Sequence, residues 1–295
     1  MLNYVYEVAT LIAVFAVGSL GLAVIVGQAG LMSLAHGAFI GVGAYVYGLL
    51  SVAAGVEPLI ALVAAIAITS VVGAFLAYAA SGLDEEQFAV TTLAFNVLIV
   101  SILTNWAELT RGSYGIAQIP RVSILGFGES RIEFLIVSAA LAAGTFFFMQ
   151  FLVKSGFGTL LRASAFDKDM VESLGSSVRR LRVGAFAVGC AAAGLAGALY
   201  AMHSGYIAPQ LFELHMSILI LAMVIIGEGR AMIGAVMGAS ILILIPELLR
   251  FAAFSAASAG PLRQVIFGGL LVTVVFVSAM RNHASKSAGE TLLAN

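Results

Sequence analysis

A serine and a histidine lie three residues apart in an apolar region, within the stretch "GQAGLMSLAHGAFIGVGAY" of residues 27–45. Ser33 and His36 are residue types that carry out nucleophilic hydrolysis when a carboxylate orients the histidine. No Asp or Glu lies near them in the sequence, and hydrolysis inside a membrane would need a water-filled site. Two alternatives remain open. One is a packed histidine bonded to a backbone carbonyl, and the other is a polar pair beside a translocation path.

Glycines interrupt the same stretch, and Gly27–Gly30 is predicted to break a helix against the bundle interior. Non-helical backbone at membrane depth is tolerated only where protein or a water-filled cavity covers it. The next helix is expected to start near Leu31 and to carry Ser33 and His36 on one face, because residues three apart are neighbours on a helix. A helix start favours a carboxylate, although glycine packing of adjoining helices explains the same residues. The candidates for the translocation path are Gly27, Gln28, Gly30, Ser33 and His36.

Other chemistries find no support in the sequence. No Gly-x-x-x-x-Gly-Lys-Ser/Thr segment is present, so any ATP chemistry must belong to a partner. Cys190 is the only cysteine, which excludes an intrachain disulfide, and its small-residue surroundings indicate a packing role. The net charge of -1 gives no basic surface for nucleic acid. We therefore expect no enzyme activity, no cofactor, no metal site and no nucleic-acid partner.

The composition indicates how these residues are positioned. Of the 295 residues, 61% are hydrophobic and 10% are charged, and the mean hydropathy is +1.08. A soluble domain carries about 25% charged residues. Repeated apolar runs of about 20 residues predict an all-α polytopic membrane protein with about 8–10 transmembrane helices, including broken or half helices. An outer-membrane barrel would instead show alternating apolar and polar residues.

We expect residues 1–280 to form one transmembrane domain and residues 281–295 to form a cytoplasmic tail. The first apolar segment has no basic region or convincing cleavage site and is predicted to be a span. A possible internal repeat aligns Gly27–Ala44 with Gly227–Ser240. The predicted spans are Val8–Val26, Leu31–Leu50, Leu59–Ala80, Phe88–Asn105, Ile132–Val153, Val183–Met202, Leu214–Gly227, Ile233–Leu249 and Leu262–Ala279.

The long connection Lys154–Arg182 holds six of the fourteen Lys and Arg residues, and the positive-inside rule places it in the cytoplasm. The turn Asp84–Glu86 then lies inside and the connection Trp106–Arg131 lies outside, while the side of the N-terminus stays open. Within the long connection, a short helix is predicted over Ala163–Leu174, closed by Gly175. Its apolar residues recur every four positions, so they are expected to share one face, which suits a membrane surface or a partner protein.

Four segments in this order resemble the permease of a bacterial branched-chain amino-acid ABC importer, the LivM-type subunit of the LivH/LivM family. They are "GQAGLMSLAHGAFIGVGAY", "TTLAFNVLIVSILTNWAELTRGSYGIAQIP", "FGTLLRASAFDKDMVESLGSSVRRLRVGAFAVGCAAAGLAGALYAMHSGYIAP" and "SILILAMVIIGEGRAMIGAVMGASILILIPELLR". The resemblance implies an inner-membrane subunit that translocates branched-chain or related apolar amino acids. It implies four kinds of partner: a homologous LivH-like permease, two LivG/LivF-like ATPases that bind ATP, a periplasmic solute-binding protein, and lipid.

The resemblance also implies that residues 154–182 carry the coupling helix that docks into the ATPase. The docking candidates are Phe166, Asp167, Asp169, Met170, Glu172 and Gly175. On the outer side, the candidate contacts for the binding protein are Glu108, Arg111 and Arg121. Permeases for urea or short amides are close alternatives. An ion-coupled transporter or channel is an alternative of another class, which the scarcity of charge within the spans disfavours. A purely structural scaffold would not need the basic loop.

Overall fold

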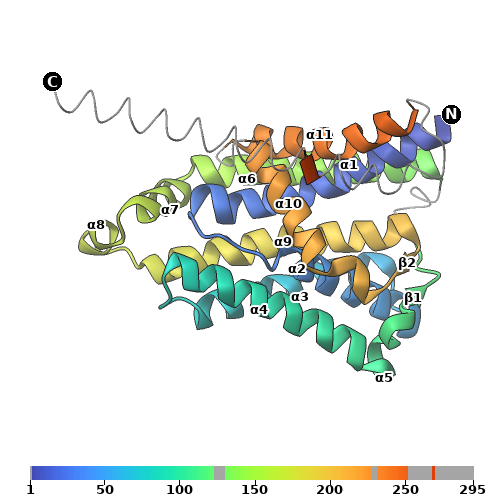
Figure 1. Ribbon diagram of the computed structural model, residues 1–295, viewed down its shortest axis with the longest axis horizontal. Coiled ribbons are helices and arrows are strands. Elements are labelled where there is room, and N and C mark those ends of the chain that lie inside the picture. Colours follow the sequence, from blue (N-terminus) through green and yellow to red (C-terminus); the bar gives the residue numbers. More distant parts are fainter. Residues whose placement is uncertain (1, 123–129, 228–230, 252–267, 270–295) are drawn as a thin grey trace.

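The computed structural model describes residues 2–122, 130–227, 231–251 and 268–269 (Figure 1). These residues form a helical bundle with one short antiparallel strand pair. The elements are α1 (Leu2–Ala23), α2 (His36–Gly48), α3 (Pro58–Ala79), α4 (Glu85–Asn105), α5 (Ala107–Thr110), β1 (Ile116–Ala117), α6 (Arg131–Lys154), α7 (Gly156–Phe166), α8 (Lys168–Ser173), α9 (Val178–Ser204), β2 (Tyr206–Ile207), α10 (Leu214–Ile226) and α11 (Met232–Phe251).

Seven helical segments in the described part of the chain are long and apolar enough to cross a membrane. π-helical turns over Val24–Gln28 and Leu49–Ala53 lengthen α1 and α2. Eight of the nine predicted spans coincide with helices, and the eighth, α11, has a shorter apolar stretch over Met232–Glu247. The predicted span Leu262–Ala279, apart from residues 268–269, and the predicted tail 281–295 lie outside the described residues. The all-α polytopic fold class is confirmed.

Local sequence sets several helix starts. Pro58 occupies the first turn of α3, where its missing N–H costs nothing. Glu85 and Glu86 lie in the first turn of α4, where negative charge suits the helix dipole. Ser130 and Glu133 form a capping box at the start of α6, in which each side chain accepts the other residue's backbone N–H. These signals are local, which is why the sequence places these starts within a few residues.

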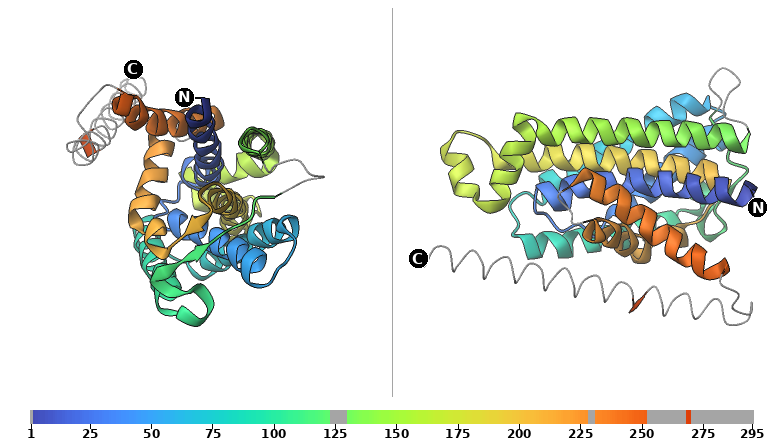
Figure 2. Two further views of the ribbon diagram at one scale, coloured as in Figure 1. Left: turned by 90° about the vertical axis from the view of Figure 1, so that its right-hand side faces the viewer. Right: turned by 90° about the horizontal axis from the view of Figure 1, so that it is seen from above.

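α9 lies near the middle of the bundle in the end-on view (Figure 2), and its glycines let neighbouring helices approach closely. A Cβ added at Gly43 of α2 would lie 2.5 Å from the Cα of Gly194 on α9. One added at Gly194 would lie 2.8 Å from the carbonyl oxygen of Ala65 on α3. Cys190 is fully buried beside Gly73. These short distances confirm the small-residue packing predicted for this segment. Close backbone contact of this kind supplies the attraction between helices in lipid.

The two ends of the bundle carry different elements (Figure 1). α7 and α8 lie at one end, where the guanidinium of Arg179 also lies 3.8 Å from the ring centre of Tyr78 at the end of α3. α5, β1 and β2 lie at the opposite end. The start of α1 is at this second end, where Glu7 pairs with Arg131 over 2.7 Å. The start of α1 and the connection 106–131 therefore lie on the same side of the bundle.

Candidate functional site

The helix break predicted at Gly27–Gly30 begins only after Gln28, since Gly27 and Gln28 are π-helical, and the following helix also begins later than expected. The backbone leaves the π-helical turn at Gln28, passes through Gly30 with φ +68°, and becomes helical again at His36. The expected start near Leu31 is therefore wrong. Ser33 lies in the non-helical segment, so Ser33 and His36 do not share a helix face. The physical reason is tertiary, because a distant side chain binds the backbone of this segment.

A cluster of polar groups surrounds the start of α2. The backbone N–H of Leu34 donates to the hydroxyl of Thr92 on α4 over 3.0 Å. The backbone N–H of Gly37 donates to the hydroxyl of Ser217 on α10 over 2.8 Å, and the same oxygen accepts the side-chain amide of Asn96 on α4 over 3.0 Å. Thr92, Asn96 and Ser217 are at most 1% exposed. Two helices, α4 and α10, thus accept backbone N–H groups at the start of α2 within the bundle, as a membrane interior requires.

Ser33 directly precedes Leu34 and His36 directly precedes Gly37, and both side chains are fully buried. Nε2 of His36 lies 2.9 Å from the carbonyl oxygen of Gly18 on α1, as expected for a packed histidine. Within the described residues, Nδ1 of His36 and the hydroxyl of Ser33 have no hydrogen-bond partner. A buried polar group without a partner costs about 1–3 kcal/mol. These two atoms therefore retain unused hydrogen-bonding capacity.

Gln28 and Gly30, which the sequence also assigned to the path, face a different element. The amide oxygen of Gln28 accepts a hydrogen bond from Nη1 of Arg162 on α7 over 3.2 Å. A Cβ added at Gly30 would lie 3.1 Å from the Cβ of Ala165, also on α7. Gly27 is half-buried within the π-helical turn. The break therefore touches the connection 154–182 at one end and the polar cluster at the other.

The connection 154–182 contains two helices instead of the predicted single helix Ala163–Leu174. α7 ends at Phe166, Asp167 has an extended backbone, and α8 begins at Lys168. The carboxylate of Asp167 accepts the backbone N–H of Met170 over 2.9 Å and so caps α8. The break arises because this capping residue starts a new helix. Gly175 has φ +80°, in keeping with its predicted role after the helix end.

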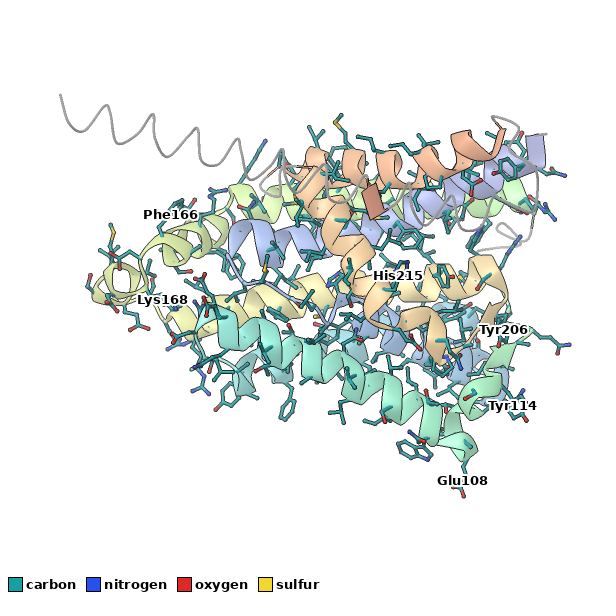
Figure 3. All side chains as sticks on the ribbon, in the orientation of Figure 1. Glu108, Tyr114, Phe166, Lys168, Tyr206 and His215 are labelled. Carbon is teal, nitrogen blue, oxygen red and sulfur yellow. The ribbon has the colours of Figure 1, made fainter. Side chains whose placement is uncertain are left out.

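The predicted docking residues are exposed at this end of the bundle, where Figure 3 labels Phe166 and Lys168. The side chains of Phe166 and Met170 are 77% and 58% exposed, although they lie on different helices. Val171 is fully buried and anchors α8. The other exposed docking candidates are Asp167, Asp169, Glu172 and Gly175.

The predicted contacts for a binding protein lie at the opposite end, where Figure 3 labels Glu108. Glu108 and Arg111 are exposed on and just after α5. Arg121 is half-buried, and its guanidinium lies 5.0 Å from the ring centre of Phe134. The short pairing of β1 with β2 joins this connection to the end of α9.

Sequence reasoning did not identify Thr92, Asn96, Ser217 or Arg162 as site residues. Asn96 carries the clearest signal, because an amide in the middle of an apolar span usually faces the bundle interior. Thr92 and Ser217 are single hydroxyl residues on apolar helices, which carry no comparable signal. Among the described residues, no group of three or more His, Cys, Asp or Glu side chains could hold a metal ion.

Comparison with known proteins agrees with this architecture. Residues 4–275 match the family described as the permease component of branched-chain amino acid transport systems. The chain belongs to this family. Together with the seven apolar segments, family membership makes it a multi-pass protein of the bacterial inner membrane.

Two relatives show how far the similarity extends. The chain is 30% identical over 299 residues to the high-affinity branched-chain amino acid transport system permease protein LivM of Escherichia coli K12, covering 91% of this chain and 67% of that protein. It is 25% identical to a probable branched-chain amino acid transport permease protein LivH of Methanocaldococcus jannaschii, covering 84% and 80% of the two chains. No solved structure matches the chain significantly.

Proposed function

We propose that this chain is a permease subunit of an ATP-driven importer for branched-chain or related apolar amino acids. The observation that carries the proposal is the buried polar cluster at the break before α2, in a chain of this permease family. Polar groups at membrane depth are costly and mark transport pathways. Ser33 and His36 supply a hydroxyl and a ring nitrogen without a partner among the described residues.

The solute is expected to pass the start of α2 with its carboxylate toward this cluster. The positive end of a helix dipole favours a carboxylate, and a broken helix places that end near the middle of the membrane. The neutral hydroxyl and imidazole groups suit a zwitterion better than a fully charged solute. An apolar amino acid therefore fits the site. Short amides carry a related but uncharged polar group, so they serve as comparison solutes.

The energy is expected to come from two separate ATPase subunits that dock on α7 and α8. Phe166 and Met170 form the apolar part of the docking surface, and Asp167, Asp169 and Glu172 form its polar part. Gly175 ends the segment. Large apolar side chains exposed at a bundle end suit a protein partner, because interface cores are rich in aromatic residues and Met.

Two further partners complete the proposed importer. A homologous permease is expected to form the other half of the path, since relatives of this chain include proteins named LivM and LivH. A solute-binding protein is expected at the opposite end, near Glu108, Arg111 and Arg121. This chain then acts as a transport subunit, and ATP is bound by the ATPases.

The test is uptake by the complete complex, reconstituted in vesicles with both permeases, the ATPases and the binding protein. We expect uptake of radiolabelled L-leucine that depends on ATP and on the binding protein, and we expect urea and acetamide to compete poorly. His36→Ala and Ser33→Ala should each lower uptake about tenfold while the complex stays assembled. Uptake without ATP would contradict the importer. Normal uptake by both variants would contradict the role of the cluster.

A further inference from the structure

The connection between the polar cluster and the docking surface is short and continuous. Residues 28–35, here called the linking segment, begin beside α7 and end at the residue before α2. Its first residues touch Arg162 and Ala165, and its last residues bind Thr92 through the backbone of Leu34. Figure 1 shows the end of α1 beside α7, and the second panel of Figure 2 agrees.

Arg162 holds the first end of the linking segment. Its Nη1 donates to the side-chain oxygen of Gln28 over 3.2 Å and to the backbone carbonyl oxygen of Val153 at the end of α6 over 3.3 Å. Gln28 is 1% exposed, so its hydrogen bond with Arg162 is shielded from water. One guanidinium thus joins the ends of α1 and α6 to α7, the helix that carries Phe166.

The first half of the linking segment is tied to the end of α1. The backbone N–H groups of Ala29 and Leu31 donate to the carbonyl oxygens of Val24 and Ile25 over 3.2 Å each. Gly30 has a left-handed backbone and lies against Ala165, which leaves little room between the segment and α7. The segment is therefore in close contact with α7 at Gly30 and bonded to the end of α1 on either side of it.

The end of α1 is a π-helical turn, Val24–Gln28, in place of regular α-helix. A π-helical turn holds one more residue than the corresponding α-helical turn, and such turns occur mostly as single insertions at functional sites. Conversion between the two forms would shift the register of Gln28 and of the segment after it. Coupling between distant sites needs such an element, whose equilibrium both sites can bias.

We propose that Arg162 is a positioning residue that passes movement of the docking helices, through Gln28 and the linking segment, to the start of α2. The inference rests on the proposed function. It names the route by which closure of the ATPase subunits on ATP is transmitted to the solute site. Arg162 touches neither solute nor nucleotide in this scheme. Its loss should therefore separate ATP hydrolysis from transport instead of abolishing both.

The experiment compares Arg162→Ala, Arg162→Lys, Gln28→Ala and the double Ala variant in the complete reconstituted complex. Arg179→Ala is the matched control, because Arg179 lies at the same end but contacts Tyr78 instead of the linking segment. For each complex we measure leucine uptake, ATP hydrolysis, unfolding temperature and co-purification of the ATPases. Movement is followed by maleimide labelling of Met32→Cys in a Cys190→Ala background, since Met32 is 50% exposed within the segment.

We expect Arg162→Ala to lower uptake at least tenfold while ATP hydrolysis stays within twofold of wild type. ATP with vanadate should change the labelling rate of Met32→Cys at least threefold in the parent, and this change should be lost in Arg162→Ala. Gln28→Ala should show the same losses as Arg162→Ala. The double variant should lose no more uptake than either single variant. Arg179→Ala should behave as wild type. If Arg162→Ala fails to assemble, the same comparison is decided by Arg162→Lys and Gln28→Ala.

The outcomes separate the two proposals. If the parent complex imports leucine and the variants Arg162→Ala and Gln28→Ala equal it in uptake and labelling, the coupling route is overturned but the proposed function stands. Equal loss of uptake and ATP hydrolysis in assembled complexes also overturns the coupling route, because the residue would then be needed for ATP hydrolysis as well as for transport. A wild-type complex without ATP-dependent uptake overturns the proposed function, and the coupling route with it.

Discussion

The side-chain amide of Asn96 on α4 donates a hydrogen bond to the hydroxyl oxygen of Ser217 on α10, over 3.0 Å. The same oxygen accepts the backbone N–H of Gly37, in the first turn of α2, over 2.8 Å. One hydroxyl group thus joins three helices inside the membrane. It also fixes the start of α2 next to the candidate path, because the hydroxyl and both of its donors are buried within the bundle.

Replacing Ser217 with Ala should therefore destabilise the protein. Two buried donors would lose their acceptor, and each unsatisfied donor costs about 1–3 kcal/mol. We expect a clearly lower unfolding temperature of the detergent-solubilised chain, measured by thermal unfolding with a fluorescent reporter. Adding Asn96→Leu to Ser217→Ala should lower the unfolding temperature little further, because one of the two unpaired donors is then removed.

Ser81→Ala is the control for this prediction. The Ser81 hydroxyl is bonded only locally, to the carbonyl oxygen of Tyr78 over 2.8 Å, and the bond is exposed. Its removal should leave the unfolding temperature close to that of wild type. If Ser217→Ala and Ser81→Ala unfold at the same temperature, the three-helix junction does not contribute to stability.

The contact between α2 and α9 makes a second prediction, at Gly43. A Cβ there would lie 2.5 Å from the Cα of Gly194, so Gly43→Ala must push the two helices apart. Overpacking of this kind costs about 1–3 kcal/mol. Gly144→Ala on α6 is matched in chemistry, but nothing lies within 4 Å of its added Cβ. We expect Gly43→Ala to lower the unfolding temperature and Gly144→Ala to leave it equal or raise it. The reverse order would contradict the close contact between Gly43 and Gly194.

Much of this fold was predictable because its signals are local. Apolar length places the spans, and a proline or acidic residue marks helix starts such as Pro58 and Glu85. The glycine-rich break at Gly27–Gly30 was also predictable, because glycines that interrupt an apolar run indicate non-helical backbone covered by the bundle. The late start of α2 at His36 was not, because Thr92 and Ser217 bind its backbone from helices far away in the sequence.

The candidate site was less predictable than the fold, for the same reason. Gln28 and Ser33 lie five residues apart and were assigned one role, but Gln28 binds Arg162 while Ser33 is buried next to Leu34, whose backbone binds Thr92. Only the folded chain shows which helix each one meets. Asp167 could have been recognised as a helix cap, which would have predicted two helices in place of one.

The cap at Asp167 leads to a third prediction. Asp167→Ala removes the acceptor for the backbone N–H of Met170, and loss of such a cap costs about 1 kcal/mol of helix stability. We expect faster amide hydrogen exchange in residues 168–175 and unchanged exchange in the spans. Asp167→Asn keeps an accepting oxygen and should restore most of the protection. Slow exchange in both variants would show that Val171 packing alone holds α8.

The last prediction concerns the exposed apolar side chains of the docking surface. Phe166→Ser should leave the unfolding temperature almost unchanged, since the side chain is 77% exposed in the isolated chain and such surface changes usually stay within about 0.5 kcal/mol. Binding of the ATPase subunits should weaken, because burying a phenylalanine contributes about 1.5–3 kcal/mol, which corresponds to a factor of about 10–140 in affinity.

Phe75→Ser on α3 separates this docking role from a general effect of removing exposed aromatic residues. Phe75 is 70% exposed on the side of a membrane span, where lipid is expected to cover it. That variant should reduce the amount of protein inserted in the membrane but leave the affinity of the inserted protein for the ATPases unchanged. Affinity is measured by titrating labelled ATPase onto nanodiscs that hold the permease pair. Equal affinities for wild type and Phe166→Ser would place the ATPase contact elsewhere, because a side chain buried in that interface cannot be removed without loss.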